Sequence, residues 1–220
     1  MIELTGLLRT TGAVRRFTDD PVDDAVLGAI LDDARFAPSG GNRQPWRVAV
    51  VRDAERRRRL AELMQPVWDA YVARAALGVT PYNVVDDRQP DTVEHAPNDL
   101  LDHIEQVPVV LAVAADLRGI ALMDGVLDRV PITGGASIYP FCWSLLLSAR
   151  AHELGGVMTT FLSRVEPDAK DELGLPDDHA LAATIFLGHP VHQPTKLQRR
   201  PVGEFATVDR FDGSPFPPPS

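Results

Sequence analysis

The sequence predicts one domain that mixes helices and strands, of either the α/β or the α+β class. Its 220 residues are 45% hydrophobic and 24% charged, which is typical of a soluble globular domain with enough apolar material for a core. Short apolar runs, typical of buried strands, alternate with longer segments of helical periodicity. The sequence contains no internal repeat and no boundary before a second core. We therefore expect a single domain over residues 1–220.

Two helices and one strand are predicted in the first third of the chain. Apolar residues follow helical spacing from Val22 to Leu31, after an acidic start. A strand is predicted for "RVAVVRD". The helical region that follows is expected to be interrupted near Pro66, because proline lacks the N–H group that a helix interior needs. Within this region, the four arginines at 56–59 indicate a solvated helix face.

The rest of the chain is predicted to hold a long excursion, buried strands and a long helix. Residues 77–106 are polar, proline-bearing and aperiodic, which is typical of a lid or binding loop. A helix that is apolar nearly all round is expected from about Ile138 to Leu154, and it must be covered by its own domain or by a partner subunit. An extended, proline-rich tail begins at about residue 190. The other predicted elements are strands in "VPVVLAVAAD", "GVMTTFL" and "HALAATIFLGHP", and a short helix with a glycine stop in "PDAKDELGLP".

Charge and cysteine content narrow the classes of partner and site. The net charge is −9 and the pI is about 5.1, whereas a nucleic-acid-binding surface is usually basic. The single cysteine excludes an internal disulfide, and the histidines show no metal-ligand spacing, so no metal site is predicted. No apolar run approaches the roughly 18 residues of a membrane span. We expect a cytoplasmic protein that binds neither nucleic acid nor membrane.

Common phosphate-binding and nucleophile motifs do not occur in the sequence. The Gly-Gly pairs at 40–41, 134–135 and 155–156 lack the spacing of a dinucleotide loop or a P-loop, and there is no Gly-x-Ser-x-Gly elbow. Cys142 lies in the apolar helix and is expected to be a buried, inert thiol. Three basic clusters could together contribute to a phosphate site, although a single cluster of this kind is usually just solvated charge: "RTTGAVRRF", "NRQPWR" and "KLQRRP".

The stretch "APSGGNRQPWRVAVV", from Ala37 to Val51, is unusually dense in hydrogen-bonding groups before its apolar end. Two glycines allow a backbone to approach a ligand closely, and Asn42 carries both a donor and an acceptor. A polar turn before a strand explains the same spacing, so the stretch alone leaves both interpretations open.

Four segments together resemble the flavin-dependent nitroreductase family: "VRRFTDDPV", "APSGGNRQPWRVAVV", "GGASIYPFCWSLLLSARAHELGGVMTTFL" and "RRPVGEFATVDRF". They occur in this order between about Thr10 and Val208, and the Pro-Ser-x-x-Asn-x-Gln-Pro-Trp motif is complete. The resemblance implies an α+β fold with a central, mostly antiparallel sheet flanked by helices. It further implies a homodimer that binds FMN at its subunit interface, with the long apolar helix at that interface.

The resemblance also implies which residues bind the cofactor. Arg15 would reach the ribityl and pyrimidine side of the flavin, where a cation favours the anionic reduced ring. Thr11 and Gly12 replace two basic family residues, so Arg9, Arg16 or a tail arginine is expected to help bind the phosphate. The implied cofactor-binding residues are Thr11, Gly12, Ala13, Arg15, Arg16, Pro38, Ser39, Asn42, Gln44, Thr159, Thr160, Arg199 and Arg200.

The implied activity is a two-step, ping-pong reaction in which NADH or NADPH reduces FMN and an electron-poor acceptor, such as a nitroaromatic or a quinone, reoxidises it. No catalytic side chain is expected, because the flavin carries the chemistry. Tyr71 and Tyr82 are candidates for substrate contact, with exposed loop positions as the alternative. Other possibilities for this fold are dehalogenation, flavin fragmentation, substrate oxidation, or flavin storage without turnover.

Overall fold

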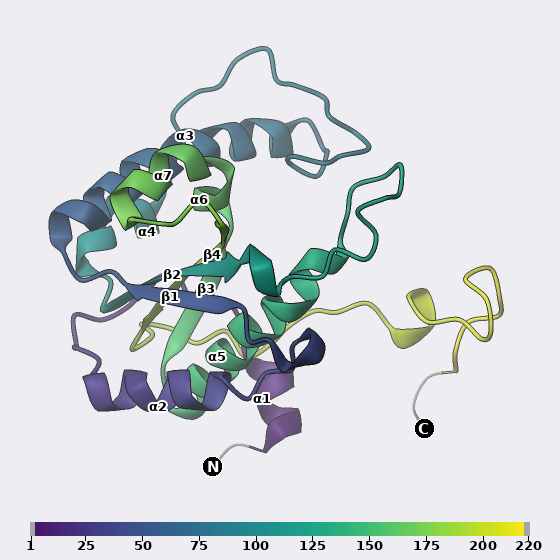
Figure 1. Cartoon of the computed structure of the whole chain (residues 1–220), viewed down its shortest axis with the longest axis horizontal. Coiled ribbons are helices and arrows are strands. Elements are labelled where there is room, and N and C mark those ends of the chain that lie inside the picture. Colours follow the sequence, from purple (N-terminus) through teal and green to yellow (C-terminus); the bar gives the residue numbers. More distant parts are fainter. Residues whose placement is uncertain (1–2, 218–220) are drawn as a thin grey trace.

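A computed structural model describes residues 3–217 of the chain (Figure 1). Its four strands form one sheet in the order β1-β2-β4-β3, and each neighbouring pair is antiparallel. This pairing makes the fold α+β, as the resemblance implies, because α/β folds are built on parallel strands. The strands are β1 (Trp46–Val50), β2 (Val109–Asp116), β3 (Gly155–Thr159) and β4 (His179–Gly188).

Helices cover both faces of the sheet (Figure 1). Ile185 and Leu187 of β4 pack with the helices of one face, and Phe186 between them packs with those of the other. The alternation follows from strand geometry, and burial on both faces explains why β2 and β4 have nearly continuous apolar sequences. One face holds α1 (Leu4–Thr10), α2 (Asp24–Ala34) and α5 (Tyr139–Ala151), and the other holds α3 (Ala54–Ala76), α4 (Asp99–Asp102), α6 (Phe161–Arg164) and α7 (Glu166–Leu173).

Most of the predicted helices and strands are confirmed, and local interactions determine where some of them begin and end. The N–H group of Arg56 donates to the side chain of Asp53, 2.7 Å away, which caps α3. α7 ends as predicted at Gly174, whose φ of +61° lies in the left-handed region that glycine adopts without steric cost. Helix α1, by contrast, was not predicted.

The predicted interruption of α3 is wrong. The helix runs continuously through Pro66 from Ala54 to Ala76. Met64 and Val67, on either side of the proline, are buried and hold both halves of the helix on the core. Pro66 and Glu62 are exposed, so water can satisfy the Glu62 carbonyl group that loses its helical partner.

The prediction of a solvated face for all four arginines at 56–59 is wrong for Arg57. This residue is buried, and its guanidinium donates hydrogen bonds to the carbonyl oxygens of Val51 (2.8 Å) and Val107 (2.7 Å). Burial lowers the pKa of Arg57 from its ordinary value. The side chain thus ties α3 to the end of β1 and the start of β2.

The excursion between α3 and β2 is irregular only in its first part. Residues 77–98 form the wide arch beyond α3 in Figure 1. The remainder of the predicted range instead forms α4 and a short turn at Ile104–Gln106. Leu100, Leu101 and Ile104 are buried there, so their apolar contacts fix this part of the chain against α3.

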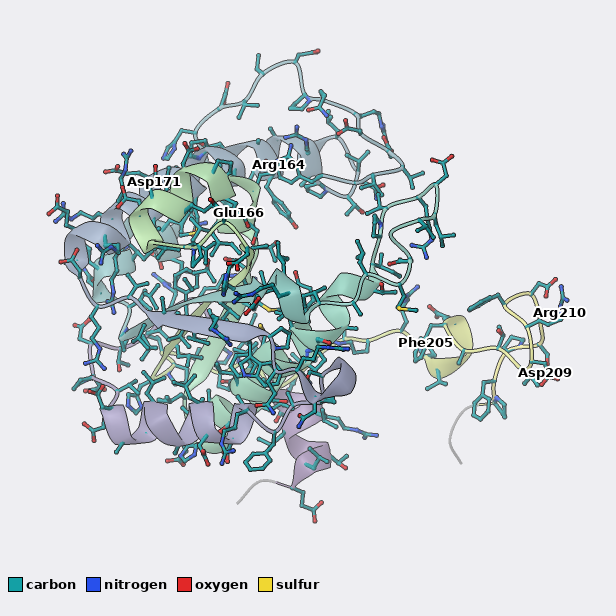
Figure 2. The ribbon with its side chains drawn as sticks, in the orientation of Figure 1. Arg164, Glu166, Asp171, Phe205, Asp209 and Arg210 are labelled. Atoms are coloured by element: carbon teal, nitrogen blue, oxygen red, sulfur yellow. The ribbon has the colours of Figure 1, made fainter. Side chains whose placement is uncertain are left out.

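The tail ends in a small arm, residues 202–216, that projects from the body (Figures 1 and 2). Its chain folds back on itself through hydrogen bonds from Phe216 N to Ala206 O (2.8 Å) and from Val208 N to Ser214 O (2.9 Å). Phe205 is 64% exposed and Phe211 is fully exposed. The arm therefore carries aromatic side chains that the body of its own chain does not cover.

Candidate functional site

One cavity brings together five of the residues predicted from the sequence. It has a volume of about 880 Å³ and lies between α3, α4, α6 and the end of β3. This is within the roughly 300–1,000 Å³ typical of small-molecule sites. Its lining includes Arg15, Arg16, Tyr71, Thr159 and Thr160. We call it the Arg15 cavity.

The position of Arg15 is set by backbone hydrogen bonds on both sides of it. Val14 N donates to Gly156 O (2.9 Å), and Thr18 N donates to His189 O (2.9 Å). These bonds lay the segment across the ends of β3 and β4, with Val14 buried and Arg15 exposed to the cavity. An anion entering the cavity would therefore meet the Arg15 guanidinium.

Arg16 differs from Arg15 in being paired. Its Nε atom lies 2.8 Å from Asp99 Oδ2, and the two side chains are 75% and 52% exposed. Such a solvated pair contributes little to stability, but it directs Arg16 towards α4. Within residues 3–217, the structure shows no carboxylate within salt-bridge distance of Arg15, so Arg15 is the better placed cation for a ligand.

Thr159 and Thr160 bring hydroxyl and backbone groups to the same cavity. Thr159 is the last residue of β3, and Thr160 precedes α6. The Thr159 hydroxyl is buried without a hydrogen-bond partner in the part of the chain that the structure describes. Buried polar groups are nearly always hydrogen-bonded, so this hydroxyl is a candidate contact for a bound molecule.

An aromatic wall, formed by Trp68, Tyr71 and Phe161, lines one side of the Arg15 cavity. The ring of Trp68 stacks on Tyr71 with centroids 5.8 Å apart, and Phe161 lies 5.8 Å from Trp68 and 5.7 Å from Tyr71. Flat, apolar surfaces of this kind favour planar ligands. Trp68 and Phe161 were not predicted from the sequence, although the three-residue spacing of Trp68 and Tyr71 places them on one helix face.

Asn98 is another residue of the cavity that was not predicted. It precedes α4, and its side-chain oxygen accepts a hydrogen bond from Leu101 N (3.4 Å), which leaves the amide NH₂ group as a donor. Trp68 holds the preceding residue through a 3.3 Å bond from its indole N–H to the Pro97 carbonyl. A polar residue shortly before an apolar pair is typical of a helix start, so the sequence did contain a sign that Asn98 precedes a helix.

The motif from Pro38 to Gln44 forms a tight turn with an unusual backbone. Gly41, Asn42 and Gln44 have φ values of +61°, +53° and +49°. The turn is held by bonds from Gln44 N to Ser39 Oγ (3.0 Å) and from Gln44 Nε2 to Asn42 Oδ1 (3.1 Å). Left-handed backbone at residues other than glycine is strained, and such strain is concentrated at functional sites.

This turn does not line the Arg15 cavity. The turn from Pro38 to Gln44, which includes Ser39 and Asn42, packs at the start of α5 on one face of the sheet, whereas the cavity is lined by residues of α3, α4 and α6, which cover the other face. Ser137, just before α5, accepts a 3.0 Å bond from Gly40 N, and Trp46 stacks on Phe141 of α5. A single copy of the chain therefore presents the predicted residues as two separate groups.

The Thr11–Gly12 segment lies beneath the tail. A Cβ atom at Gly12 would come within 2.7 Å of the Pro194 carbonyl oxygen and 3.0 Å of Leu197, so only glycine fits there. Gln193 Nε2 donates to Gly12 O (3.2 Å). Ala13 is exposed beside this contact, as are Arg199 and Arg200, which follow Leu197 closely in sequence. The contacts of the tail with Gly12 thus come from Gln193, Pro194 and Leu197.

A charged network supports the start of β1 after the turn. Asp116 N donates to Pro45 O (2.7 Å), and the Asp116 carboxylate accepts two bonds from Arg118, of 2.8 and 2.7 Å. The Arg118 hydrogen bonds hold the pKa of Asp116 well below its usual range. His179, whose Nδ1 lies 2.7 Å from Asp178, adjoins the pair.

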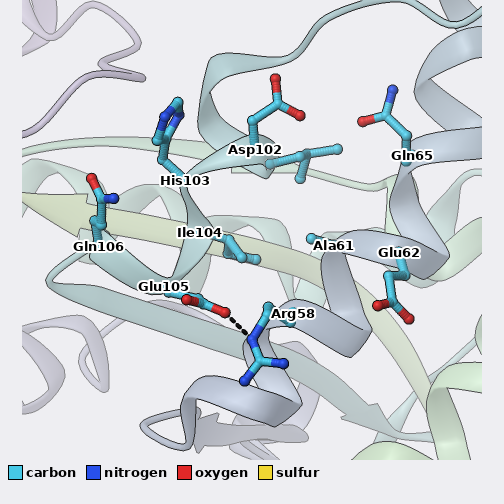
Figure 3. Close-up of a pocket in the computed structure, with 10 residues that line it drawn as sticks. Arg58, Ala61, Glu62, Gln65, Asp102, His103, Ile104, Glu105 and Gln106 are labelled. Carbon is cyan, nitrogen blue, oxygen red and sulfur yellow. Dashed lines mark ion pairs between the residues drawn. The ribbon is translucent and has the colours of Figure 1, made fainter.

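The other groove and the single thiol are less suited to catalysis than the Arg15 cavity. A groove of about 410 Å³ beside α3 contains none of the predicted residues, and Arg58 within it pairs with Glu105 (Figure 3). Burial raises the pKa of the Cys142 thiol to about 12, which supports the expected inert thiol. Residues 3–217 contain no cluster of potential metal ligands and no helix long and apolar enough to cross a bilayer.

Tyr82 lies outside the lining of the Arg15 cavity, unlike the other predicted substrate contact, Tyr71. Its ring is instead held between Arg74 and Arg164.

Comparison with known proteins identifies the family. A sequence model described as the nitroreductase family matches residues 8–189. The chain is 31% identical to an NADH dehydrogenase of Thermus thermophilus over 86% of its length and 88% of the relative's. It is 34% identical to a 5,6-dimethylbenzimidazole synthase of Rhodobacter capsulatus, over 85% and 83% of the two chains. The fold matches the NADPH:FMN oxidoreductase of Vibrio harveyi with a TM-score of 0.67 and 19% identity, over 94% and 76% of the chains. The chain belongs to the nitroreductase family.

Proposed function

We propose that the protein is an FMN-dependent oxidoreductase that uses NADH or NADPH to reduce an electron-poor acceptor of the nitroaromatic or quinone type. One observation carries the proposal: a cavity that combines an uncompensated arginine, an unpartnered buried hydroxyl and a wall of aromatic rings. These groups suit a planar, polar-edged ring system with an anionic side chain. Family membership and the shared fold with the Vibrio harveyi NADPH:FMN oxidoreductase support the choice of FMN.

The same proposal requires a homodimer. The turn at Ser39–Gln44 and the Arg15 cavity lie on opposite sides of the sheet, so a site that uses both needs two copies. Helix α5 carries Tyr139, Trp143 and Leu147 along one face, and the first two are 41% and 39% exposed. Burial of such apolar side chains favours association, which supports α5 as the central interface helix.

We assign the phosphate end of FMN to the tail. Arg199 and Arg200 follow a segment that packs on Gly12, so they can supply the positive charge that Thr11 and Gly12 lack. Arginine suits this role because its planar guanidinium donates paired hydrogen bonds to phosphate oxygens. Thr11 contributes less, because its hydroxyl donates to Leu7 O (2.7 Å) within α1.

Different groups of the protein would then act on different parts of the flavin ring system. FMN, when bound, supplies the redox chemistry by accepting and donating a hydride equivalent. Arg15 stabilises negative charge that develops on the ring, and Asn98 and Thr159 donate hydrogen bonds to its polar atoms. We assign the side of the cavity at the aromatic wall to a second planar molecule. NADH or NADPH and the acceptor would therefore occupy this space in turn, which gives a ping-pong order.

A second candidate is other flavin chemistry in the same site. The Rhodobacter capsulatus relative is named 5,6-dimethylbenzimidazole synthase and is as similar to this chain as the Thermus thermophilus NADH dehydrogenase. Family membership alone thus does not choose between acceptor reduction and flavin fragmentation, dehalogenation or storage.

Anaerobic reduction tests the proposal. Purified protein is loaded with FMN and mixed with NADH or NADPH, and then with 1,4-benzoquinone. We expect the visible flavin absorbance to disappear in the first step and to return in the second. Flavin that binds but is not bleached by either nicotinamide would contradict acceptor reduction and favour the second candidate.

A further inference from the structure

Thr184, in β4, is a fully buried polar residue whose hydroxyl the packing of the core does not explain. The residue is 0% exposed, and its hydroxyl has no hydrogen-bond partner among residues 3–217. Burial of a hydroxyl without a hydrogen bond is unfavourable, whereas a valine of nearly the same shape would fill the same space without that cost. A polar group left in this way in a core needs an explanation other than packing.

Thr184 lies directly opposite Thr159 in the sheet. The two residues are partners in the antiparallel register of β3 and β4, and side chains of such partners share a face, with Cβ atoms about 4.5–5.5 Å apart. The Thr159 hydroxyl is likewise buried without a partner in the described part of the chain. Threonines placed in this way can hydrogen-bond to each other after rotation about their Cα–Cβ bonds.

The face that the two threonines share is the one that borders the Arg15 cavity. Thr159 lines the cavity, and so does Phe186, which follows Thr184 by two residues and therefore lies on the same face of β4. Thr184 itself is covered and does not line the cavity. A ligand would thus sense the Thr184 hydroxyl only through a neighbouring side chain, and Thr159 is the neighbour that carries a hydroxyl.

We infer that Thr184 is a positioning residue that holds the Thr159 hydroxyl as a hydrogen-bond donor to the FMN ring system. The inference rests on the proposed function, since it concerns FMN binding. A hydroxyl has one donor and two acceptor sites, so Thr159 Oγ can accept from Thr184 and still donate its own proton to the flavin. Each bond of such a chain strengthens the other. A bound flavin would then give both buried hydroxyls a partner.

Two substitutions separate the hydroxyl of Thr184 from its shape. Thr184→Val keeps the shape and removes the hydroxyl, so we expect the Kd for FMN to rise about 2- to 10-fold, as for the loss of one neutral hydrogen bond. Thr184→Ser keeps the hydroxyl and removes a buried methyl group, so its Kd should stay close to the wild-type value. Quenching of flavin fluorescence on titration into the apoprotein measures both.

Urea unfolding of the apoproteins should rank the two variants in the opposite order. Thr184→Val replaces an unpartnered hydroxyl by a methyl group, so its urea midpoint should equal or exceed that of the wild type, while the small cavity in Thr184→Ser should lower the midpoint. A general folding defect would instead lower affinity and midpoint together. A lower midpoint in Thr184→Val would show that the hydroxyl has a partner in the apoprotein already, and would contradict the inference.

Ser163, in α6, provides a matched control. Its hydroxyl is also buried without a partner within residues 3–217, but Ser163 does not line the Arg15 cavity. Ser163→Ala removes this hydroxyl, and we expect it to leave the Kd for FMN unchanged. A rise equal to that of Thr184→Val would mean that loss of any buried hydroxyl near α6 weakens binding, and would remove the special role of Thr184.

A double-mutant cycle tests whether Thr184 acts through Thr159. In a Thr159→Val background, Thr184→Val should have no further effect on the Kd for FMN. Equal effects in both backgrounds, or no effect in either, would overturn the inference. Wild-type protein that does not bind FMN would overturn the proposed function and the inference with it, whereas wild-type binding with an unchanged Thr184→Val affinity would overturn the inference alone.

Discussion

At the scale of single residues, Arg15 and Arg16 show how neighbouring identical side chains acquire different roles. Arg16 is paired with Asp99 at 2.8 Å, while Arg15 faces the cavity beside the buried Val14. The resemblance already implied different roles for them, with Arg15 near the ring and Arg16 near the phosphate. Both side chains are exposed and line the cavity, so the ion pair with Asp99 is what distinguishes Arg16 in the structure.

Replacement of Arg15 should weaken cofactor binding. A hydrogen bond that involves a charged group contributes about 1.5–3 kcal/mol, so Arg15→Gln is expected to raise the Kd for FMN roughly 10- to 100-fold. Quenching of flavin fluorescence on titration into the apoprotein measures this. Arg35→Gln, on the remote end of α2, serves as the control and should bind FMN like the wild type. Equal affinities for the Arg15 and Arg35 variants would remove Arg15 from the site.

At the scale of secondary-structure elements, the ends of β1 and β2 position the turn at Ser39–Gln44. Asp116 closes β2, bonds through its N–H group to Pro45, and holds Arg118 through its carboxylate. The arrangement depends on an ionised carboxylate. Its contribution to stability should therefore depend on pH.

Asp116→Asn should lower the free energy of unfolding at pH 7, and the difference from the wild type should shrink in acid. A carboxyl whose folded pKa lies below its unfolded value of about 3.9 stabilises the fold above that value. The stabilisation is lost progressively as the pH falls below about 4 towards the folded pKa. Urea unfolding at pH 7 and at pH 3 measures the difference. As a control, Asp212→Asn removes a similar ion pair from the exposed arm and should have little effect on unfolding at either pH. An effect of Asp116→Asn that does not depend on pH would contradict this explanation.

The elements themselves were largely predictable, and the exceptions have physical reasons. β2, β4 and α7 follow directly from apolar runs and a glycine stop. The predicted break in helix α3 came from the local effect of Pro66 on the backbone. Such a prediction does not take into account that Met64 and Val67, on either side, are buried in the core. The buried role of Arg57 depends on carbonyl groups from two other elements, which local sequence does not reveal.

The candidate site was predictable from sequence only in part. The motif around Ser39 and Asn42 is contiguous and could be recognised, and its place in the site stays a prediction. The aromatic wall combines Trp68 with Phe161, which are far apart in sequence, and Asn98 joins them through the return of the excursion. Such contacts arise from the packing of α3 on α6 and have no local pattern.

At the scale of the whole molecule, exposed apolar side chains support the proposed association of two copies. The α5 face with Tyr139 and Trp143 is partly exposed. The projecting arm at residues 202–216 carries Phe205 (Figure 2) and the fully exposed Phe211. Each is apolar area that a second copy could bury. In the proposed dimer, the Arg15 cavity of one copy and the Ser39–Gln44 turn of the other would complete one site.

A charge on the α5 face should separate the two copies. Trp143→Glu is expected to shift the protein to a monomer, since an ionised side chain in an apolar interface is strongly unfavourable. FMN binding should weaken with it. Light scattering after size-exclusion chromatography gives the mass of each variant. As a control, Val85→Glu should stay dimeric, because this valine of the arch is already 93% exposed. A Trp143→Glu dimer with normal FMN affinity would place the interface elsewhere.

The most direct test of the central claim is the FMN content of hybrid dimers formed from Arg15→Gln and Asn42→Ala subunits that carry different tags. If each site takes Arg15 from one copy and Asn42 from the other, a hybrid contains one site with both lesions and one intact site. We predict that hybrids bind one FMN per dimer with wild-type affinity, while each variant homodimer binds it weakly. Hybrids that bind FMN as weakly as the homodimers would show that both residues act within one chain, and would contradict the shared site.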